Sequence, residues 1–237
     1  MEQAKEGYLG DLSKTDIIFN LINVPHENRD ESWEDQLIDA LPTASFRCGE
    51  PQVIAGPDGF PYFQVLMPEP NVGFQCFVIE KMKDDFLLEN GFGVVLNPQD
   101  GRPDWVLTAG DILNYHLNGT FYSTVHEFAE HTHDEVVDQD EEVMVAQPSE
   151  FILPTSTRTL LKRLFEANGI AQPKVLLMLR KYADGMKHDI VFNVTENNFE
   201  SRQAFSDFMN AVRWYLPRHY SFVGMEESVF GGAFMDL

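Results

Sequence analysis

The sequence predicts an α+β protein of two small domains, each a mainly antiparallel sheet with helices packed on it. Apolar residues recur at helical spacing in six segments and form short strand-like runs between them, and turn residues separate these segments. Residues 1–149 hold 28 acidic and 7 basic residues, whereas residues 150–237 hold 10 of each, so the first part carries the entire net charge of −21. This step in charge indicates a domain boundary.

Two helices are predicted at the start of the chain. Ser13 and Ser32 are each placed to cap a helix, because each is followed three residues later by an aspartate. Pro25 and Pro42 end the two helices, since the residue before a proline avoids the helical conformation. The apolar residues expected to face the core are Ile17, Ile18, Leu21 and Ile22 in the first helix and Trp33, Leu37, Ile38 and Leu41 in the second.

Strands and two further helices complete the first domain, which we expect to span residues 1–130. The turn Gly56–Gly59 reverses the chain between two of the strands. One helix covers Met82–Asn90, and another is capped by Thr108 and ends before Gly119. The expected strands are Phe46–Cys48, Gln52–Ile54, Tyr62–Met67, Phe74–Ile79, Gly93–Leu96 and Trp105–Leu107.

An acidic segment separates the two predicted domains. Residues 131–148 contain six acids and no base, and a chain with this pattern repels itself and stays extended. We interpret it as an interdomain linker. The second domain, residues 149–237, reads α-β-β-α-β, which is typical of helices packed on one face of a small sheet. Its elements are Thr155–Asn168, Lys174–Tyr182, His188–Val194, Glu200–Leu216 and Tyr220–Met225.

The end of the chain is unusually apolar. Residues 228–237 contain Val229, Phe230, Phe234 and Met235 around two glycines. We expect this tail to dock on its own fold or on a second copy of the chain, which leaves a homodimer as one alternative.

Composition excludes several classes of partner. A membrane span needs about 20 consecutive apolar residues, and the longest apolar run, Val175–Leu179, has five. The first residues lack the basic and apolar pattern of a secretory signal, so we expect a cytoplasmic protein with Cys48 and Cys76 reduced. The acidic excess argues against nucleic-acid binding, which needs clustered lysine and arginine. The expected partner is therefore another protein.

One cluster of residues has metal-binding chemistry. His126, Glu130, His131 and His133 combine imidazole and carboxylate groups. On a helix, His126 and Glu130 would lie one turn apart, and His131 and His133 could chelate a metal from an extended segment. Established patterns do not fit, because HExxH requires a second histidine where Glu130 stands. The alternative interpretation is a solvated linker that happens to contain histidine.

No other motif indicates catalysis or a cofactor. The sequence has no G-x-S-x-G around a nucleophilic serine and neither of the glycine-rich phosphate-binding patterns. Cys48 has no histidine near it in the sequence and is interpreted as a buried structural thiol. We therefore expect no cofactor, name no catalytic residue, and favour a non-enzymatic role.

Two stretches carry a family resemblance. The segment GFGVVLNPQDGRPDWVLTAGDI (Gly91–Ile112) resembles the end of the N-terminal domain of SseB-like proteins, the enhanced-serine-sensitivity group. Residues 153–225 resemble the C-terminal domain of that family, through LPTSTRTLLKRLF, PKVLLMLR and WYLPRHYSFVGM. These motifs are structural and none is catalytic. The resemblance implies a cytoplasmic protein that acts by interaction, with its specific role open.

Three hypotheses about function remain. The first is a non-enzymatic protein-interaction or adaptor protein of SseB-like type. The second is a metal-dependent enzyme that uses the cluster His126–Glu135. The third is an acidic protein that binds a basic partner, because the order of elements in the first domain is similar to that of secretion chaperones, and an immunity-like role would have the same charge. The excess of acids also fits a simpler interpretation, in which it only keeps the chain in solution.

Overall fold

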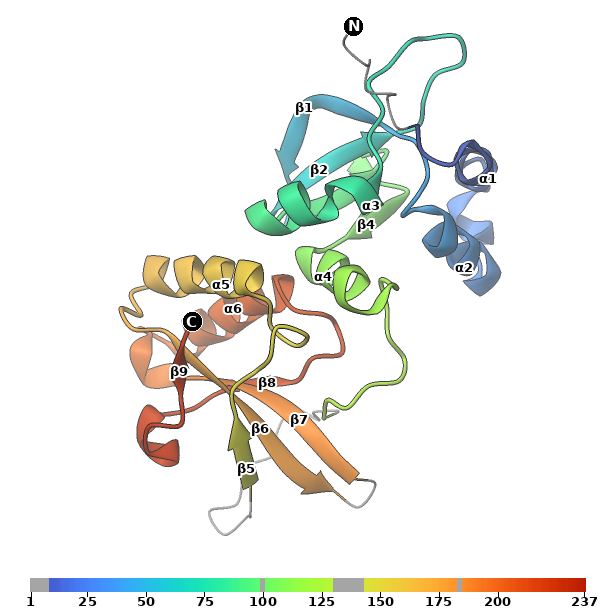
Figure 1. The fold of residues 1–237 in the computed structure, drawn as a ribbon. Helices are drawn as coiled ribbons and strands as arrows, with labels where there is room; N and C mark the ends of the chain where they lie inside the picture. The colour runs from blue at the N-terminus through green and yellow to red at the C-terminus, as the bar shows by residue number, and fades with distance from the viewer. Residues whose placement is uncertain (1–8, 99–100, 130–142, 183–184) are drawn as a thin grey trace, which may run out of the picture. The chain divides into compact units, whose positions relative to one another are not determined.

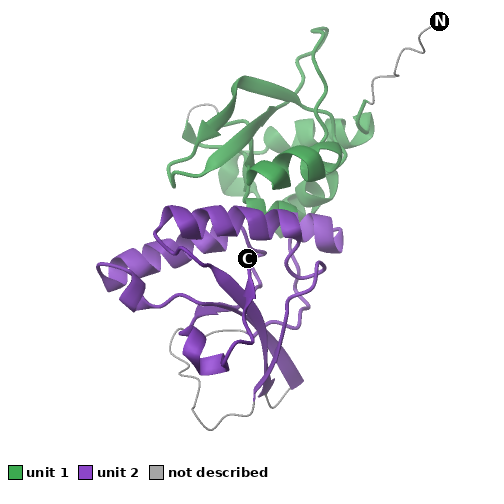
Figure 2. Cartoon of the chain, turned by 60° about the vertical axis from the view of Figure 1, so that its left-hand side comes forward, with its two compact units in different colours: residues 1–112 green, residues 113–237 purple. Residues whose placement is uncertain are grey.

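The computed structural model describes residues 9–98, 101–129, 143–182 and 185–237. The chain divides into two compact units, residues 1–112 and 113–237 (Figure 2). Each unit contains one sheet with helices, so the predicted α+β class is confirmed. Each sheet is mainly antiparallel and contains one parallel pair of strands. Among the described residues, no helix combines the length and the apolar character needed to cross a membrane.

The first unit is built on a four-stranded sheet in the order β1-β2-β3-β4 (Figure 1). The parallel pair is β2 and β3, because the chain crosses between them through a helical segment rather than a tight turn. The other neighbouring pairs are antiparallel. The strands are β1 (Arg47–Ala55), β2 (Pro61–Leu66), β3 (Gly93–Leu96) and β4 (Trp105–Leu107).

The helical segments of the first unit are α1 (Leu12–Ile22), η1 (His26–Asn28), α2 (Glu31–Ala40), α3 (Ile79–Met82), the π-helical turn η2 (Lys83–Leu88), and α4 (Ala109–Asn118). The two units divide within α4.

The first two helices begin earlier than predicted. Asp11 caps α1 and Asp30 caps α2, each through its carboxylate, whereas Ser13 and Ser32 were the predicted caps. An aspartate satisfies the free N–H groups as well as serine does and also complements the helix dipole.

Two strand predictions in the first unit need correction. The expected strands Phe46–Cys48 and Gln52–Ile54 are, apart from Phe46, parts of one strand, β1, with an irregular register between Cys48 and Val53. The expected strand Phe74–Ile79 is reduced to a single bridge between Phe46 and Phe77. The chain enters α3 directly after this bridge, so no longer ladder forms there.

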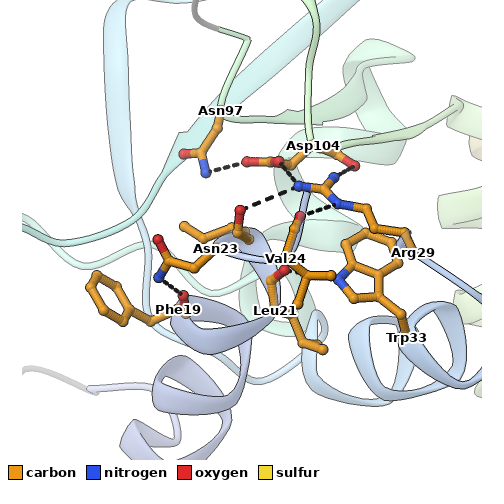
Figure 3. A network of polar contacts seen from close by, with 9 residues as sticks. Phe19, Leu21, Asn23, Val24, Arg29, Trp33, Asn97 and Asp104 are labelled. Carbon is orange, nitrogen blue, oxygen red and sulfur yellow. Dashed lines mark hydrogen bonds and ion pairs between the residues drawn. The ribbon is translucent and has the colours of Figure 1, made fainter. Parts of the chain in front are cut away.

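Arg29 joins the loop after α1 to the turn before β4 (Figure 3). Its Nη2 donates to Asp104 Oδ1 at 2.7 Å, and its Nε donates to the carbonyl oxygen of Val24 at 3.0 Å. Asn97 Nδ2 donates to the other oxygen of Asp104 at 2.8 Å. The guanidinium carbon lies 4.5 Å from the centre of the Trp33 ring. The network ties the connection between α1 and α2 to the turn before β4.

The second unit contains a five-stranded sheet in the order β5-β6-β7-β8, with β9 paired to β6. Only β7 and β8 run parallel. The strands are β5 (Val143–Ala146), β6 (Lys174–Tyr182), β7 (Gly185–Phe192), β8 (Phe222–Gly224) and β9 (Met235–Asp236). The helical segments are α5 (Thr155–Ala167), η4 (Glu196–Asn198), α6 (Arg202–Trp214) and η5 (Glu227–Phe230).

Alternate residues of β6 face two different hydrophobic clusters. Val175 and Leu177 pack with α5 and α6, which both lie on one side of the sheet in Figure 1. Leu176 and Met178 face the other side, where they pack against Phe234 of the tail. The tail thus docks on its own fold, the first of the two outcomes expected from its composition. The homodimer stays a prediction.

The division between the units differs from the predicted one. The predicted boundary is an acidic linker, residues 131–148. In the structure, Val143–Ala146 form β5 and pair with β6, and residues 131–142 lie outside the described part of the chain. Phe128, assigned to the first domain, is buried in the core of the second unit. The step in charge reflects the side chains on the surface. The division into units depends instead on which strands pair and which apolar side chains pack together, and charge does not reveal these contacts.

Candidate functional site

The structure describes only one member of the predicted metal cluster. Glu130, His131 and His133 lie outside the described residues. Residues 126–129 form no helix, so the one-turn spacing considered for His126 does not arise there. Within the described part of the chain, no three histidine, cysteine, aspartate or glutamate residues are grouped so that they could hold a metal ion.

His126 instead belongs to a packed aromatic cluster in the second unit. Its ring stacks on that of His219, with centroids 4.8 Å apart, and its Nδ1 is buried without a hydrogen-bond partner among the described residues. The Phe128 ring lies 5.7 Å from both His188 and His219. Burial, together with the neighbouring His126, lowers the pKa of His219 to about 4. The stacked ring is therefore neutral near pH 7 and packs as an aromatic group.

The first unit has an open apolar groove of about 340 Å³, which we call the α1 groove. One wall is a face of α1, since its four residues there follow the helical spacing i, i+3, i+4 and i+7. The other wall is the segment that follows β2. The lining residues are Leu12, Thr15, Asp16 and Phe19 from α1, and Met67, Pro68, Glu69 and Pro70 from the opposite segment.

The groove exists because α1 is apolar on two faces. Ile18 and Leu21 are buried in the core. Leu12 and Phe19 lie over one another on a separate face and are 63% and 44% exposed. The first face was predicted from the sequence and the second was not, and Ile17, which was predicted to face the core, is exposed. The seven-residue spacing of Leu12 and Phe19 was the signal that could have revealed it.

Half of the exposed apolar side chains among the described residues belong to, or lie close in sequence to, the two segments that line this groove. Of the twelve large apolar side chains that are exposed among the described residues, six lie in residues 9–19 and 67–74. Isolated exposed apolar residues are ordinary, whereas a concentration of them typically marks an interaction site. The six are Leu9, Leu12, Ile17, Phe19, Val72 and Phe74.

The polar side chains that line the groove differ in whether they have a hydrogen-bond or ion-pair partner. Arg47 Nη2 lies 2.8 Å from Glu69 Oε1, and Arg47 Nε donates to the carbonyl oxygen of Met67 at 3.0 Å, so arginine both neutralises and anchors that wall. The Thr15 hydroxyl accepts from the Ser45 backbone N–H at 2.8 Å. The exposed Asp16 carboxylate has no hydrogen bond or ion pair to the described residues.

The α1 groove can therefore offer a partner an apolar surface and one available carboxylate. Its eight lining residues include no histidine, cysteine or lysine. No family model, no curated protein and no solved structure matches the chain, so the SseB-like resemblance stays a prediction from the sequence.

Proposed function

We propose that this chain is a non-enzymatic, cytoplasmic protein-interaction or adaptor protein that binds a partner segment in the α1 groove. The observation that carries the proposal is the exposure of Leu12 and Phe19 on the wall of an open hollow. Burying such side chains on binding is favourable by roughly 25 cal/mol per Å² of apolar surface. An SseB-like role, expected from the resemblance, agrees with a site of this kind.

The enzyme hypothesis has less support. Three of the four predicted metal ligands lie outside the described residues, and the fourth, His126, is stacked against His219. Nothing observed in the described residues adds a further ligand to the set. The hypothesis of a basic partner, made from the acidic charge of the first domain, is compatible with a partner that binds in this groove.

The proposal can be tested with a displayed library of random short peptides selected on the full chain. We expect the selected peptides to lose about tenfold or more in affinity for the double variant Leu12→Ala/Phe19→Ala, because about 1.4 kcal/mol of apolar contact is a factor of ten. Phe151→Ala is the matched control, since Phe151 is 85% exposed in the second unit. Peptides that bind the double variant as well as the natural chain would overturn the proposal.

A further inference from the structure

The charge of the first unit determines what kind of partner the α1 groove can accept. Residues 1–112 contain 20 acidic and 7 basic residues, a net charge of −13. Four of the seven bases already form ion pairs with acids of the same unit: Lys14 with Asp39, Arg29 with Asp104, Arg47 with Glu69, and Lys83 with Asp84. The unit therefore keeps a large excess of acids that its own cations do not match.

Of the two acidic side chains that line the groove, one has no cation paired with it. Glu69 is paired with Arg47, so that wall is locally neutral. Asp16 stands on the opposite wall between Leu12 and Phe19, and its exposed carboxylate has no partner among the described residues. A ligand in the groove thus meets apolar surface together with one unmatched negative charge.

A second copy of this chain is a poor occupant on electrostatic grounds. It would bring a second Asp16 and a second net charge of −21 towards the first. Like charges brought together at an interface oppose association and select against such a partner. A cationic partner gains from the same field, which increases its rate of encounter.

On this basis, and resting on the function proposed above, we propose that the occupant of the α1 groove is a cationic amphipathic segment of another protein. Its apolar side chains fill the hollow against Leu12 and Phe19, and one lysine or arginine pairs with the Asp16 carboxylate. The apolar contact supplies most of the affinity. An exposed ion pair contributes only about 0.2–1 kcal/mol. Its role is therefore to favour a cationic partner over an anionic one.

The test uses synthetic fluorescent peptides and the full chain, with binding followed by anisotropy. Two leucine–lysine peptides are compared, one with leucines at helical spacing and one with leucines alternating, together with versions in which glutamate replaces lysine. We expect at least one lysine peptide to bind and both glutamate peptides to fail. Binding should weaken as salt is raised, because exposed charges are screened beyond about 8 Å at physiological ionic strength.

Variants of the chain locate the charge effect. Asp16→Asn should weaken the lysine peptide about two- to fivefold, as expected for the loss of one exposed ion pair. Asp35→Asn is the matched control, because it removes the same charge from an exposed position on α2 that does not line the groove. Equal losses in the two variants would show a diffuse effect of net charge and would overturn the proposed contact.

The outcomes separate this proposal from the one on which it rests. If glutamate peptides bind as well as lysine peptides and Leu12→Ala/Phe19→Ala weakens both, the groove is a binding site and the cationic partner is wrong. If lysine peptides bind the double variant normally, the groove itself is wrong. If no peptide binds, and sedimentation shows a dimer that the double variant abolishes, the occupant is a second copy. If removing residues 1–8 makes binding tenfold tighter or more, the occupant is the chain's own beginning.

Discussion

Arg29 and Asp104, which are 75 positions apart in the sequence, form a nearly buried ion pair with 2.7 Å between Nη2 and Oδ1. Their side chains are only 9% and 15% exposed. Further hydrogen bonds support the pair, since Arg29 donates to the carbonyl oxygens of Val24 and Ile22 and Asp104 accepts from Asn97. Burying an ion pair whose other hydrogen bonds are made costs little free energy. Burying one of the two charges without its partner is strongly destabilising.

Replacing Arg29 with methionine should therefore destabilise the chain by about 3–5 kcal/mol, because the Asp104 carboxylate would stay buried without its partner. Urea unfolding measures this change. Lys14→Met is the matched control, since it breaks a pair with Asp39 whose side chains are 28% and 74% exposed, and it should cost less than about 1 kcal/mol. Equal losses in the two variants would show that the network in Figure 3 does not hold the first unit together.

Gly224 should not tolerate a side chain. A Cβ added there would lie 2.2 Å from the carbonyl oxygen of Val194, which is backbone and cannot turn away. Gly224→Ala should cost about 2 kcal/mol or more, through displacement of β8 from β7. Gly73→Ala is the control, because no atom lies within 4 Å of its added Cβ, and the loss of freedom in the unfolded chain makes it neutral or slightly stabilising. Thermal unfolding of both variants checks the difference.

The elements that the sequence predicted best are those whose signals are local. The bounds of β3, β4 and β6 agree with the prediction, since each is a short apolar run between turn residues. The cap predicted at Thr108 is also confirmed, because its hydroxyl accepts from the Asp111 N–H at 3.1 Å. The strand β5 was missed, because Val143–Ala146 directly follow an acidic run and their partner lies more than thirty residues later.

The local sequence pattern contained only part of the information needed to find the candidate site. Helical spacing places Leu12 and Phe19 on one face of α1, but only the packing of α1 against the core decides that this face stays open. Pro68 and Pro70 lack the N–H needed for a further strand, so the segment after β2 leaves the sheet and forms the second wall. Histidine and carboxylate side chains indicate metal binding by their chemistry, whereas an apolar groove has no comparable sequence motif.

The packing of His126 also leads to a prediction about metals. We expect the purified chain to contain no stoichiometric zinc, iron or manganese, because the His126 ring is stacked on His219 and its Nδ1 faces no ligand group in the described residues. Elemental analysis measures this directly. The enzyme hypothesis would be restored by a metal present at one equivalent and lost in the double variant His131→Ala/His133→Ala.

His219 should make the stability of the chain depend on pH. Its pKa is lowered to about 4 from an ordinary value of 6.5, first because burial disfavours the imidazolium and then because His126 is near. In this range the unfolded chain binds a proton that the native chain does not. The contribution of His219 to the free energy of unfolding is therefore complete above about pH 6.5 and is lost as the pH falls towards about 4.

The variant His219→Gln isolates this contribution, because glutamine does not titrate. We expect the free energy of unfolding of the natural chain to fall more steeply than that of the variant between about pH 6.5 and 4. Measurement near pH 8, where both side chains are neutral, gives the separate cost of losing the ring contacts with His126, Phe128 and Tyr220. Parallel curves for the two proteins would mean that His219 is protonated as easily in the native state as in the unfolded chain, and that the cluster does not exclude the charged ring.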